Sequence, residues 1–419
     1  MSHKHPIAVD PGAVAILRGD KNAPQVDGTL GIPQTLDEVI ATFGKWLFLP
    51  DPSALKITLG AVAANLAEGD PLWLLLVGAT GSGKTELLDP LLGLPNVYSV
   101  GTLTEASLLS GSPKRETGKD ASGGLLRQMG DFGFLVLKDF TTILSMGKEI
   151  RGPLLAALRE ISDGHWTRHV GVDGGRTIAW KGKCALIAGC TPAIDQHHAL
   201  MATMGERFLL FRTPPMDQEQ QAVRAMQHVT QENKMRRQLR EAAVGLFNGY
   251  QRQDRAFSED SAARMAALAT LVARARSAVE RDSYKREIEL IPDSEMPGRL
   301  ACSLKCLFHG LQNIGVADKE AWRLIGKVGL DCIPDVRRKA LTCLNKQNQP
   351  ITTKAVAQAL AYPWTTVRRV LEDLTGHGLV QCFRPDSNDP ESWQISSLFK
   401  ELIMKAQVDL ASPEKADSL

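Results

Sequence analysis

The sequence has almost no net charge, because 49 Lys and Arg residues stand against 47 Asp and Glu residues in a chain of 419. This balance excludes a protein that attracts nucleic acid through its overall field, so DNA contacts would come from local patches. The seven cysteines have no paired spacing, and the first residues contain no apolar signal region. These absences predict a reduced, cytoplasmic protein that does not contact a membrane.

One group of cysteines has helical spacing. A helix would bring Cys302, Cys306 and His309 to one face, where they could offer three metal ligands. Their apolar neighbours favour the alternative of reduced cysteines in the core, because free cysteine behaves as a small buried hydrophobe. We therefore expect no metal ion at this group.

The length allows two or three domains, and 43% hydrophobic residues are enough for a substantial core. Residues 1–33 are rich in Pro, Gly, Asp and Asn and predict a flexible N-terminal arm. Thr35, with Glu38 three residues later, predicts the N-cap of a helix to about Leu49. Pro52 then begins a second helix.

The most informative stretch is an apolar run that ends in a glycine-rich loop. Residues 73–77 are typical of a buried strand, and a helical pattern begins at Glu86. Between them lies the G-x-x-x-x-G-K-[ST] pattern of a phosphate-binding loop. The predicted nucleotide contacts are Gly78, Ala79, Thr80, Gly81, Ser82, Gly83, Lys84, Thr85 and Glu86. The alternative is a glycine-rich turn that binds no ligand.

The residue types in this loop suit a nucleoside triphosphate. Glycine permits a close approach that a Cβ would block, so backbone N–H groups at a helix N-terminus can surround phosphates. Lys84 is expected to reach the β- and γ-phosphates, and the Thr85 hydroxyl to bind Mg²⁺. The pattern therefore predicts ATP and Mg²⁺ as cofactors.

Further apolar runs predict strands that alternate with helices. A helical pattern spans Lys148 to Ile161, and two polar-apolar segments around Asp173-Gly174-Gly175 predict a hairpin. The apolar runs cover residues 97–100, 134–137, 184–190 and 208–211. Strands that alternate with helices imply an α/β fold with a parallel sheet covered on both faces.

The order of these pieces resembles the AAA+ core of the minichromosome-maintenance replicative helicases and, more distantly, that of the bacterial enhancer-binding ATPases. Residues from about 54 to 215 match, with Gly124-Leu125-Leu126 before the strand at 134–137 and the hairpin before the strand at 184–190. The resemblance implies an AAA+ P-loop sheet, a helical lid and an ATP-driven ring. The large N-terminal domain of the cellular helicases is missing, so a compact mobile-element or phage replication helicase is the nearer comparison.

The resemblance also implies roles for individual residues. Thr191 follows the strand at 184–190, where sensor 1 helps to orient the attacking water. Arg207 follows Met-Gly-Glu in the segment that supplies an arginine finger to a neighbouring subunit. Arg299 is a candidate for the lid arginine called sensor 2, and a surface role fits it equally well. Asp139 is the expected catalytic and metal-binding carboxylate.

One position departs from this family. Its helicases have Asp-Glu at the end of the strand that corresponds to 134–137, where this chain has Lys138-Asp139. In one interpretation, Asp139 keeps the catalytic position and the metal lacks its usual acidic support, which leaves a weak or inactive ATPase. In the other, Asp139 is the metal-side carboxylate, and Thr141, Thr142 or a partner residue positions water. We favour an active enzyme, because the other nucleotide-site residues would have little purpose in an inactive one.

The predicted hairpin combines basic and aromatic side chains, as a channel for single-stranded DNA requires. In the helicases that the chain resembles, a hairpin before sensor 1 grips DNA in the central channel. The candidate contacts are Trp166, Arg168, Arg176, Lys181 and Lys183. The alternative is that the tryptophans pack the hairpin against the core and the charges are solvated.

The last part of the chain predicts helices and then a small mixed module. Long helical segments follow Pro215, and the first is expected over Glu219 to Tyr250. Helices at 352–360 and 364–375, followed by a two-stranded wing, resemble a winged helix-turn-helix, whose second helix enters the major groove. The predicted domains are the arm at 1–33, an AAA+ core at 34–215, a helical lid at 216–333, and a winged-helix domain with tail at 334–419.

Arg368 and Arg369 lie on that second helix and are candidate duplex contacts. Winged helices also dock proteins, which is the alternative for this module. The favoured function is an ATP-driven DNA translocase or helicase that acts as a hexameric ring in replication of a mobile element or phage, with DNA and replication proteins as partners. The alternatives are an ATP-dependent DNA-binding regulator or loader that remodels a protein partner, and an inactive nucleotide-binding scaffold.

Overall fold

The computed structural model describes residues 32–110, 123–171, 175–203, 207–282, 284, 286–384, 386 and 389–410. The chain divides into two compact units. Unit 1 comprises Met1–Pro192, Thr213–Asp254 and Cys306–Ala321, and unit 2 comprises Ala193–Arg212, Arg255–Lys305 and Trp322–Leu419. Almost all of the predicted N-terminal arm lies outside the described residues, as does the predicted hairpin turn at 172–174.

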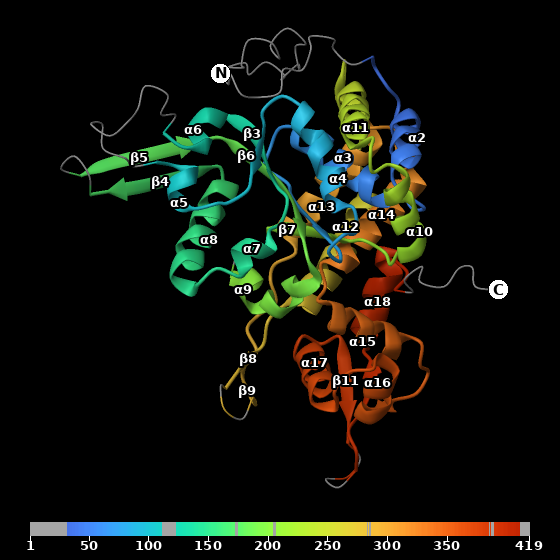
Figure 1. The fold of residues 1–419 in the computed structure, drawn as a ribbon. Coiled ribbons are helices and arrows are strands. Elements are labelled where there is room, and N and C mark those ends of the chain that lie inside the picture. Colours follow the sequence, from blue (N-terminus) through green and yellow to red (C-terminus); the bar gives the residue numbers. More distant parts are fainter. Residues whose placement is uncertain are drawn as a thin grey trace. The chain divides into compact units, whose positions relative to one another are not determined.

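The fold contains a five-stranded sheet in the order β2-β3-β6-β1-β7. Of these strands, Figure 1 labels β3, β6 and β7. The pairs β2–β3, β3–β6 and β6–β1 are parallel. The strands are β1 (Trp73–Val77), β2 (Val97–Val100), β3 (Phe132–Leu137), β6 (Lys183–Cys190) and β7 (Phe208–Arg212). Every residue of β1 is buried, as expected for a parallel strand with both faces covered. The predicted α/β class with a parallel sheet is confirmed.

Strand register determines where the loops of unit 1 meet. Val77 at the end of β1 lies opposite Cys190 at the end of β6, and Leu137 at the end of β3 lies opposite Ala188. The carboxyl ends of three neighbouring strands therefore share one edge of the sheet. In open α/β sheets this edge is where ligands bind.

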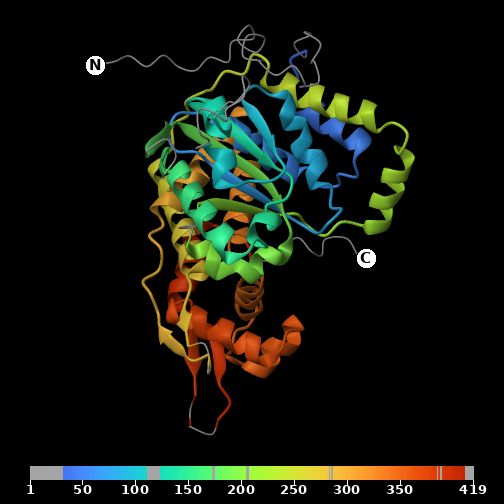
Figure 2. The ribbon, with the colours of Figure 1, turned by 60° about the vertical axis from the view of Figure 1, so that its left-hand side comes forward.

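The helices of unit 1 agree in most places with the sequence pattern, and several of them pack against this sheet (Figure 2). They are α2 (Leu36–Trp46), α3 (Ser53–Asn65), α4 (Lys84–Leu88), α5 (Glu105–Leu108), α6 (Leu125–Met129), α7 (Thr141–Leu144), α8 (Lys148–Ser162), α10 (Gln218–Gln227) and α11 (Glu232–Phe247), with a 3₁₀ helix, η1 (Asp89–Gly93). The predicted cap of α2 is confirmed, because the backbone N–H of Thr35 donates to Glu38 Oε2 at 2.7 Å in a capping box. The single helix predicted from Glu219 to Tyr250 is wrong, since residues 228–231 separate α10 from α11.

The predicted hairpin of unit 1 is present. Strands β4 (His165–Val170) and β5 (Arg176–Lys181) pair antiparallel, with Trp166 opposite Trp180. Cross-strand partners point to the same face of a hairpin, so both tryptophans project to one side.

Unit 2 combines helices with two small antiparallel sheets. Its elements are η4 (Pro192–His197, which begins in unit 1), α9 (His198–Thr203), α12 (Glu259–Arg276), β8 (Glu280–Arg281), β9 (Ile288–Leu290), α15 (Asp335–Asn345), β10 (Ile351–Thr352), α16 (Thr353–Leu360), α17 (Trp364–Gly376), β11 (Val380–Phe383), β12 (Ser392–Ile395) and α18 (Ser397–Ala406). Helices α13 (Gly298–Asn313) and α14 (Asp318–Asp331) contribute residues to both units. The two strands predicted at the end of this module are present as the antiparallel pair β11–β12, and a third strand that was not predicted, β10, pairs with β12.

A buried arginine joins the C-terminal helices of unit 2. Arg337 on α15 is 6% exposed, and its guanidinium donates to the carbonyls of Ala275 and Ser277 and to Asp373 Oδ2 at 2.9 Å. Removal of a partner from such a buried pair leaves polar groups without compensation. Truncation of the chain near Pro334 would therefore expose the interior of unit 2. Point variants are the appropriate tests of the C-terminal module at 334–419.

The expectation of core cysteines is wrong for part of the Cys302 group. Cys302 is exposed and Cys306 half-buried, while His309 Nδ1 lies 3.1 Å from Gln312 Oε1. None of the helices in the described part of the chain combines the length and apolarity needed to cross a bilayer.

Candidate nucleotide-binding site

The glycine-rich loop connects β1 to α4 at the carboxyl edge of the sheet. Gly81 and Gly83 have φ values of +82° and +78°, which side-chain-bearing residues rarely adopt. Gly78 is buried, and a Cβ there would lie 2.2 Å from Thr213 Oγ1. The loop is therefore built around glycine at three positions, as a backbone cradle for phosphate requires.

The Lys84 side chain lies over this loop. Its ammonium donates to the carbonyl oxygens of Gly78 and Ala79, both at 2.7 Å, and to Ser82 Oγ at 3.3 Å. Burial lowers the pKa of Lys84, and the neighbouring Asp139 carboxylate acts in the opposite direction. The predicted lysine and the predicted carboxylate thus act on one another across the edge of the sheet.

Asp139 follows β3 and begins a short network of polar side chains. Its Oδ1 accepts from the backbone N–H of Thr141 at 2.9 Å. Thr141 Oγ1 lies 3.1 Å from Thr191 Oγ1 and accepts from the backbone N–H of Thr191 at 2.9 Å. Burial raises the pKa of the adjacent Cys190 to about 11, so this thiol is neutral. The network brings Asp139 and Thr191 to the same edge as Lys84.

Lys138, the residue that departs from the helicase pattern, is paired. Its ammonium lies 3.2 Å from Oδ1 of Asp89, which directly follows α4. The main chain at this position is held against β6, since the backbone N–H of Phe140 donates to the carbonyl of Gly189 at 2.7 Å. The sequence pattern gave no indication of Asp89 as the partner of Lys138.

Two helices beyond the predicted core also contact the loop and α4, which the motif alone did not predict. Gln221 Nε2 on α10 donates to the carbonyl of Gly81 at 2.7 Å. Arg236 on α11 lies 3.2 Å from Oε1 of Glu86, so the residue after Thr85 binds a cation of the same unit. These contacts join residues far apart in the sequence, and no local pattern indicates them.

The fit of ATP and Mg²⁺ can be judged from these groups. The loop offers backbone N–H groups and one ammonium for phosphates, and Thr85 and Asp139 offer the oxygen ligands that Mg²⁺ prefers. A phosphate would take the place of the loop carbonyls as the partner of Lys84. The residues present therefore suit a magnesium-nucleotide complex.

The two arginines that the resemblance implied belong to unit 2. Arg207 is half-buried and directly precedes β7, whereas the Met204–Glu206 segment before it lies outside the described residues. Arg299 is exposed in the first turn of α13. Their roles as arginine finger and lid arginine stay predictions.

The side chains of the hairpin are not arranged as a channel for single-stranded DNA would require, which is what the sequence favoured. Trp166 and Trp180 are 5% and 7% exposed, and the Trp180 indole donates to the carbonyl of Gly130 at 2.8 Å. Arg168 donates to the carbonyl of Leu109 at 2.9 Å. The aromatic faces are thus unavailable for base stacking, as in the packing alternative, while Lys181 is exposed and Arg176 half-buried at the surface.

Lys183 is also turned inward, so it leaves the set of surface DNA contacts. Its ammonium donates to the carbonyl of Ala67 at 2.6 Å. Burial lowers its pKa from 10.5 to about 8, with smaller opposing effects from Cys306 and Asp70. Its position at the start of β6 is at the opposite edge of the sheet from the phosphate loop.

Lys183 gives the stability a pH dependence of definite sign. Between pH 8 and 10.5 the unfolded chain binds more protons at this residue than the folded chain does, because the folded pKa is the lower one. The free energy of unfolding should therefore rise with pH across this window by about 2 to 3 kcal/mol more than in Lys183→Met. Urea titrations of both proteins at about pH 7 and about pH 10 measure the difference. Equal pH dependences would show that Lys183 is not buried in this way.

On α17, the two candidate DNA-binding arginines differ. Arg368 is bound to both carboxylate oxygens of Glu391, at 2.8 and 2.9 Å. The Glu391 carboxylate also pairs with Arg384. Arg369 is exposed. Of the two, Arg369 presents the more accessible charge.

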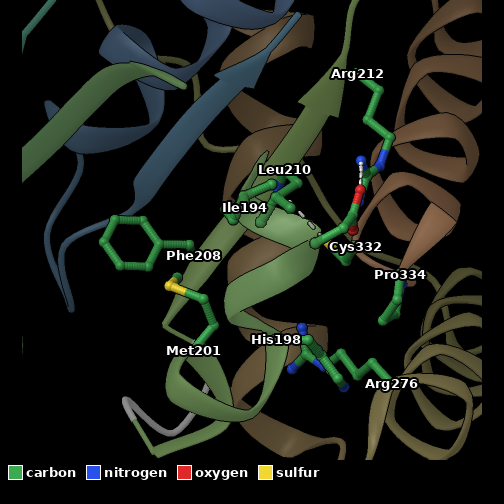
Figure 3. Close-up of a pocket in the computed structure, with 10 residues that line it drawn as sticks. Ile194, His198, Met201, Phe208, Leu210, Arg212, Arg276, Cys332 and Pro334 are labelled. Atoms are coloured by element: carbon green, nitrogen blue, oxygen red, sulfur yellow. Dashed lines mark hydrogen bonds and ion pairs between the residues drawn. The ribbon is translucent and has the colours of Figure 1, made fainter. Parts of the chain in front are cut away.

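A separate cavity of about 40 Å³ lies within unit 2 (Figure 3). On its polar side, Arg212 binds both carboxylate oxygens of Asp195 at 2.8 Å. Burial lowers the pKa of His198 to about 3, and the nearby Arg337 adds to the effect, so the imidazole is neutral. A volume of this size holds about one water molecule. It shares no residue with the phosphate loop.

Comparisons with known proteins leave the family open. No protein-family model matches the chain, and no curated protein sequence matches it. Among solved structures, the chain is similar to the A form apo structure of the NrS-1 C-terminal region, with 14% identity and a TM-score of 0.26 over 88% of this chain and 77% of that one. For the A form apo structure of NrS-1 CTR(305-718), the identity is 13% and the TM-score 0.29 over 88% and 76%. Values this low assign neither fold nor function.

Proposed function

We propose that this chain is an AAA+ type P-loop ATPase that hydrolyses ATP with Mg²⁺ and uses the energy to move along or remodel DNA as an oligomeric ring, of which a hexamer is the expected form. The observation that carries the proposal is the meeting of Lys84, Asp139 and the Thr141–Thr191 pair at the ends of three adjacent parallel strands. A glycine-rich turn without a ligand would need neither this carboxylate nor this hydroxyl pair beside its lysine.

Each of these side chains has a definite task in phosphoryl transfer. Lys84 binds the β- and γ-phosphates, and the N–H groups of the loop hold their oxygens. Thr85 and Asp139 would hold Mg²⁺, which neutralises charge that develops on the phosphates. Thr191, held by Thr141, would orient the attacking water. With one carboxylate at the end of β3, this arrangement follows the interpretation in which Asp139 is the metal-side group.

The Asp139→Asn variant tests the metal-side role. It should bind ATP almost as well as the wild type and hydrolyse it about 10 to 100 times more slowly, the usual loss when a group that supports a metal is neutralised. Single-turnover hydrolysis and equilibrium nucleotide binding measure the two effects separately. Asp131→Asn, at the other end of β3, is the matched control. Equal hydrolysis by the Asp139 variant and the wild type would remove Asp139 from the site.

The C-terminal module supports a duplex-binding role for the proposed motor. Its elements run in the order helix α15, strand β10, helices α16 and α17, and strands β11 and β12, an order that resembles a winged helix-turn-helix. The second of the paired helices, α17, would then enter the major groove. Protein docking by the same module is the competing role.

Arg369→Ala should weaken duplex binding and reduce its salt dependence by about one counterion, because one phosphate contact is lost. Arg368→Ala should have the smaller effect, since that guanidinium is already bound to Glu391. Fluorescence anisotropy with a labelled duplex over a salt series gives both quantities. If neither variant changes affinity or salt slope, protein docking becomes the better role for this module.

The buried hairpin tryptophans favour a second function, an ATP-dependent regulator or loader that remodels a protein partner. Because Trp166 and Trp180 are buried, the described strands of this hairpin would hold single-stranded DNA through their charges, without base stacking on these tryptophans. ATP hydrolysis with and without single-stranded DNA separates the two functions. Stimulation by single-stranded DNA supports the translocase, whereas stimulation by duplex DNA alone supports the regulator.

A further inference from the structure

Two pairs of opposite charges lie between α4 and the end of β3. In one pair the cation is on the α4 side, and in the other the anion is. Lys84 begins α4 and interacts electrostatically with Asp139. Asp89 directly follows α4, and its two carboxylate oxygens lie 3.2 and 3.3 Å from the ammonium of Lys138. The segment from Lys84 to Asp89 therefore contributes one cation and one anion, and so do the two residues that follow β3.

The second pair is held on both sides by packed structure. The Asp89 side chain is 16% exposed and is followed by the buried Pro90. At the other end, a Cβ at Gly189 would lie 2.5 Å from the carbonyl oxygen of Lys138, so β6 holds the main chain there closely. The backbones at both ends are therefore held, and the pair between them joins α4 to β3 through a Lys138 side chain that is 52% exposed.

A third element holds the same helix from another direction. Arg236 on α11 binds Glu86, and Asp89 also acts electrostatically on Arg236. Asp89 therefore lies among two cations, one from the end of β3 and one from α11. The short helix that begins at the phosphate-binding lysine is held through its acidic residues on both sides.

We infer that Asp89 and Lys138 are positioning residues that set the separation of Thr85 on α4 from Asp139 after β3. The inference rests on the proposed function, in which Thr85 and Asp139 hold Mg²⁺. Lys138 then has a structural role of its own. It stands where the helicases have an acidic residue, its charge is paired with Asp89, and the pair keeps Asp139 at a suitable distance from the phosphate loop.

The experiment compares Asp89→Asn, Lys138→Met and the double variant. Each single variant should raise the Mg²⁺ concentration for half-maximal ATP binding about three- to fivefold, the size expected for a partly exposed ion pair. The double variant should be no worse than either single one, because both changes break the same link. ATP affinity in EDTA should stay within about twofold of the wild type, since the loop and Lys84 are intact.

Glu401→Gln, which breaks the exposed Lys405–Glu401 pair of α18, is the matched control and should leave the Mg²⁺ requirement unchanged. The inference is overturned by an unchanged Mg²⁺ requirement, by additive effects in the double variant, or by an equal loss of affinity in EDTA. The last outcome would mean that the pair only maintains the fold. If the wild type binds no ATP with or without Mg²⁺, the proposed function itself fails and the inference fails with it.

Discussion

Replacement of Lys84 by alanine should abolish ATP hydrolysis. The ammonium lies over the phosphate loop and donates to three of its oxygen atoms, so its loss removes the one side-chain cation that the loop offers the β- and γ-phosphates. The free energy of unfolding should change by less than about 1 kcal/mol, since the bonds lost are partly exposed.

A coupled phosphate-release assay and a urea titration check both parts of this expectation. Lys400→Ala on α18, an exposed lysine in unit 2, is the matched control and should hydrolyse ATP at the wild-type rate. Turnover by Lys84→Ala equal to that of the wild type would remove the phosphate-loop assignment.

Replacement of Arg207 by alanine should leave nucleotide binding nearly intact and slow hydrolysis by about 10³- to 10⁵-fold, the range measured for arginine fingers in other P-loop enzymes. The reason is that the finger stabilises charge that develops in the transition state and contributes little to the ground state. Nucleotide affinity by fluorescence and hydrolysis by single turnover separate the two effects.

Mixing subunits tests whether Arg207 acts on a neighbour. Rings that combine Arg207→Ala with Lys84→Ala subunits should recover part of the activity, because some interfaces then pair an intact finger with an intact phosphate loop. Absence of recovery at every mixing ratio would argue against action between subunits.

The sheet could be predicted from the sequence because its signals are local. Strands β1 and β2 begin and end where their predicted runs do, and β3, β6 and β7 differ from theirs by one or two residues. The errors fall where local signals are weak. No glycine or proline marks the break between α10 and α11 at 228–231, and β10 has only two residues, too few for a periodic pattern.

The candidate site was predictable where its residues form one motif or, like Asp139 and Thr191, directly follow a strand that the resemblance marks. Gly78 to Thr85 form one motif, whereas the Asp89–Lys138 pair joins residues 49 apart and the Gln221–Gly81 bond joins residues 140 apart. The register of the hairpin places Trp166 and Trp180 on one face, but only packing decides whether that face is buried. Residue types alone could not separate a DNA-binding hairpin from a packed one.

The most direct test is the steady-state rate of ATP hydrolysis by the purified full chain with Mg²⁺, measured with and without single-stranded DNA and beside Lys84→Ala as the blank. The account predicts hydrolysis that depends on Mg²⁺, rises when DNA is added and is absent in the Lys84 variant. No hydrolysis above the blank in any assembly or DNA state would contradict it and leave a nucleotide-gated scaffold as the better description.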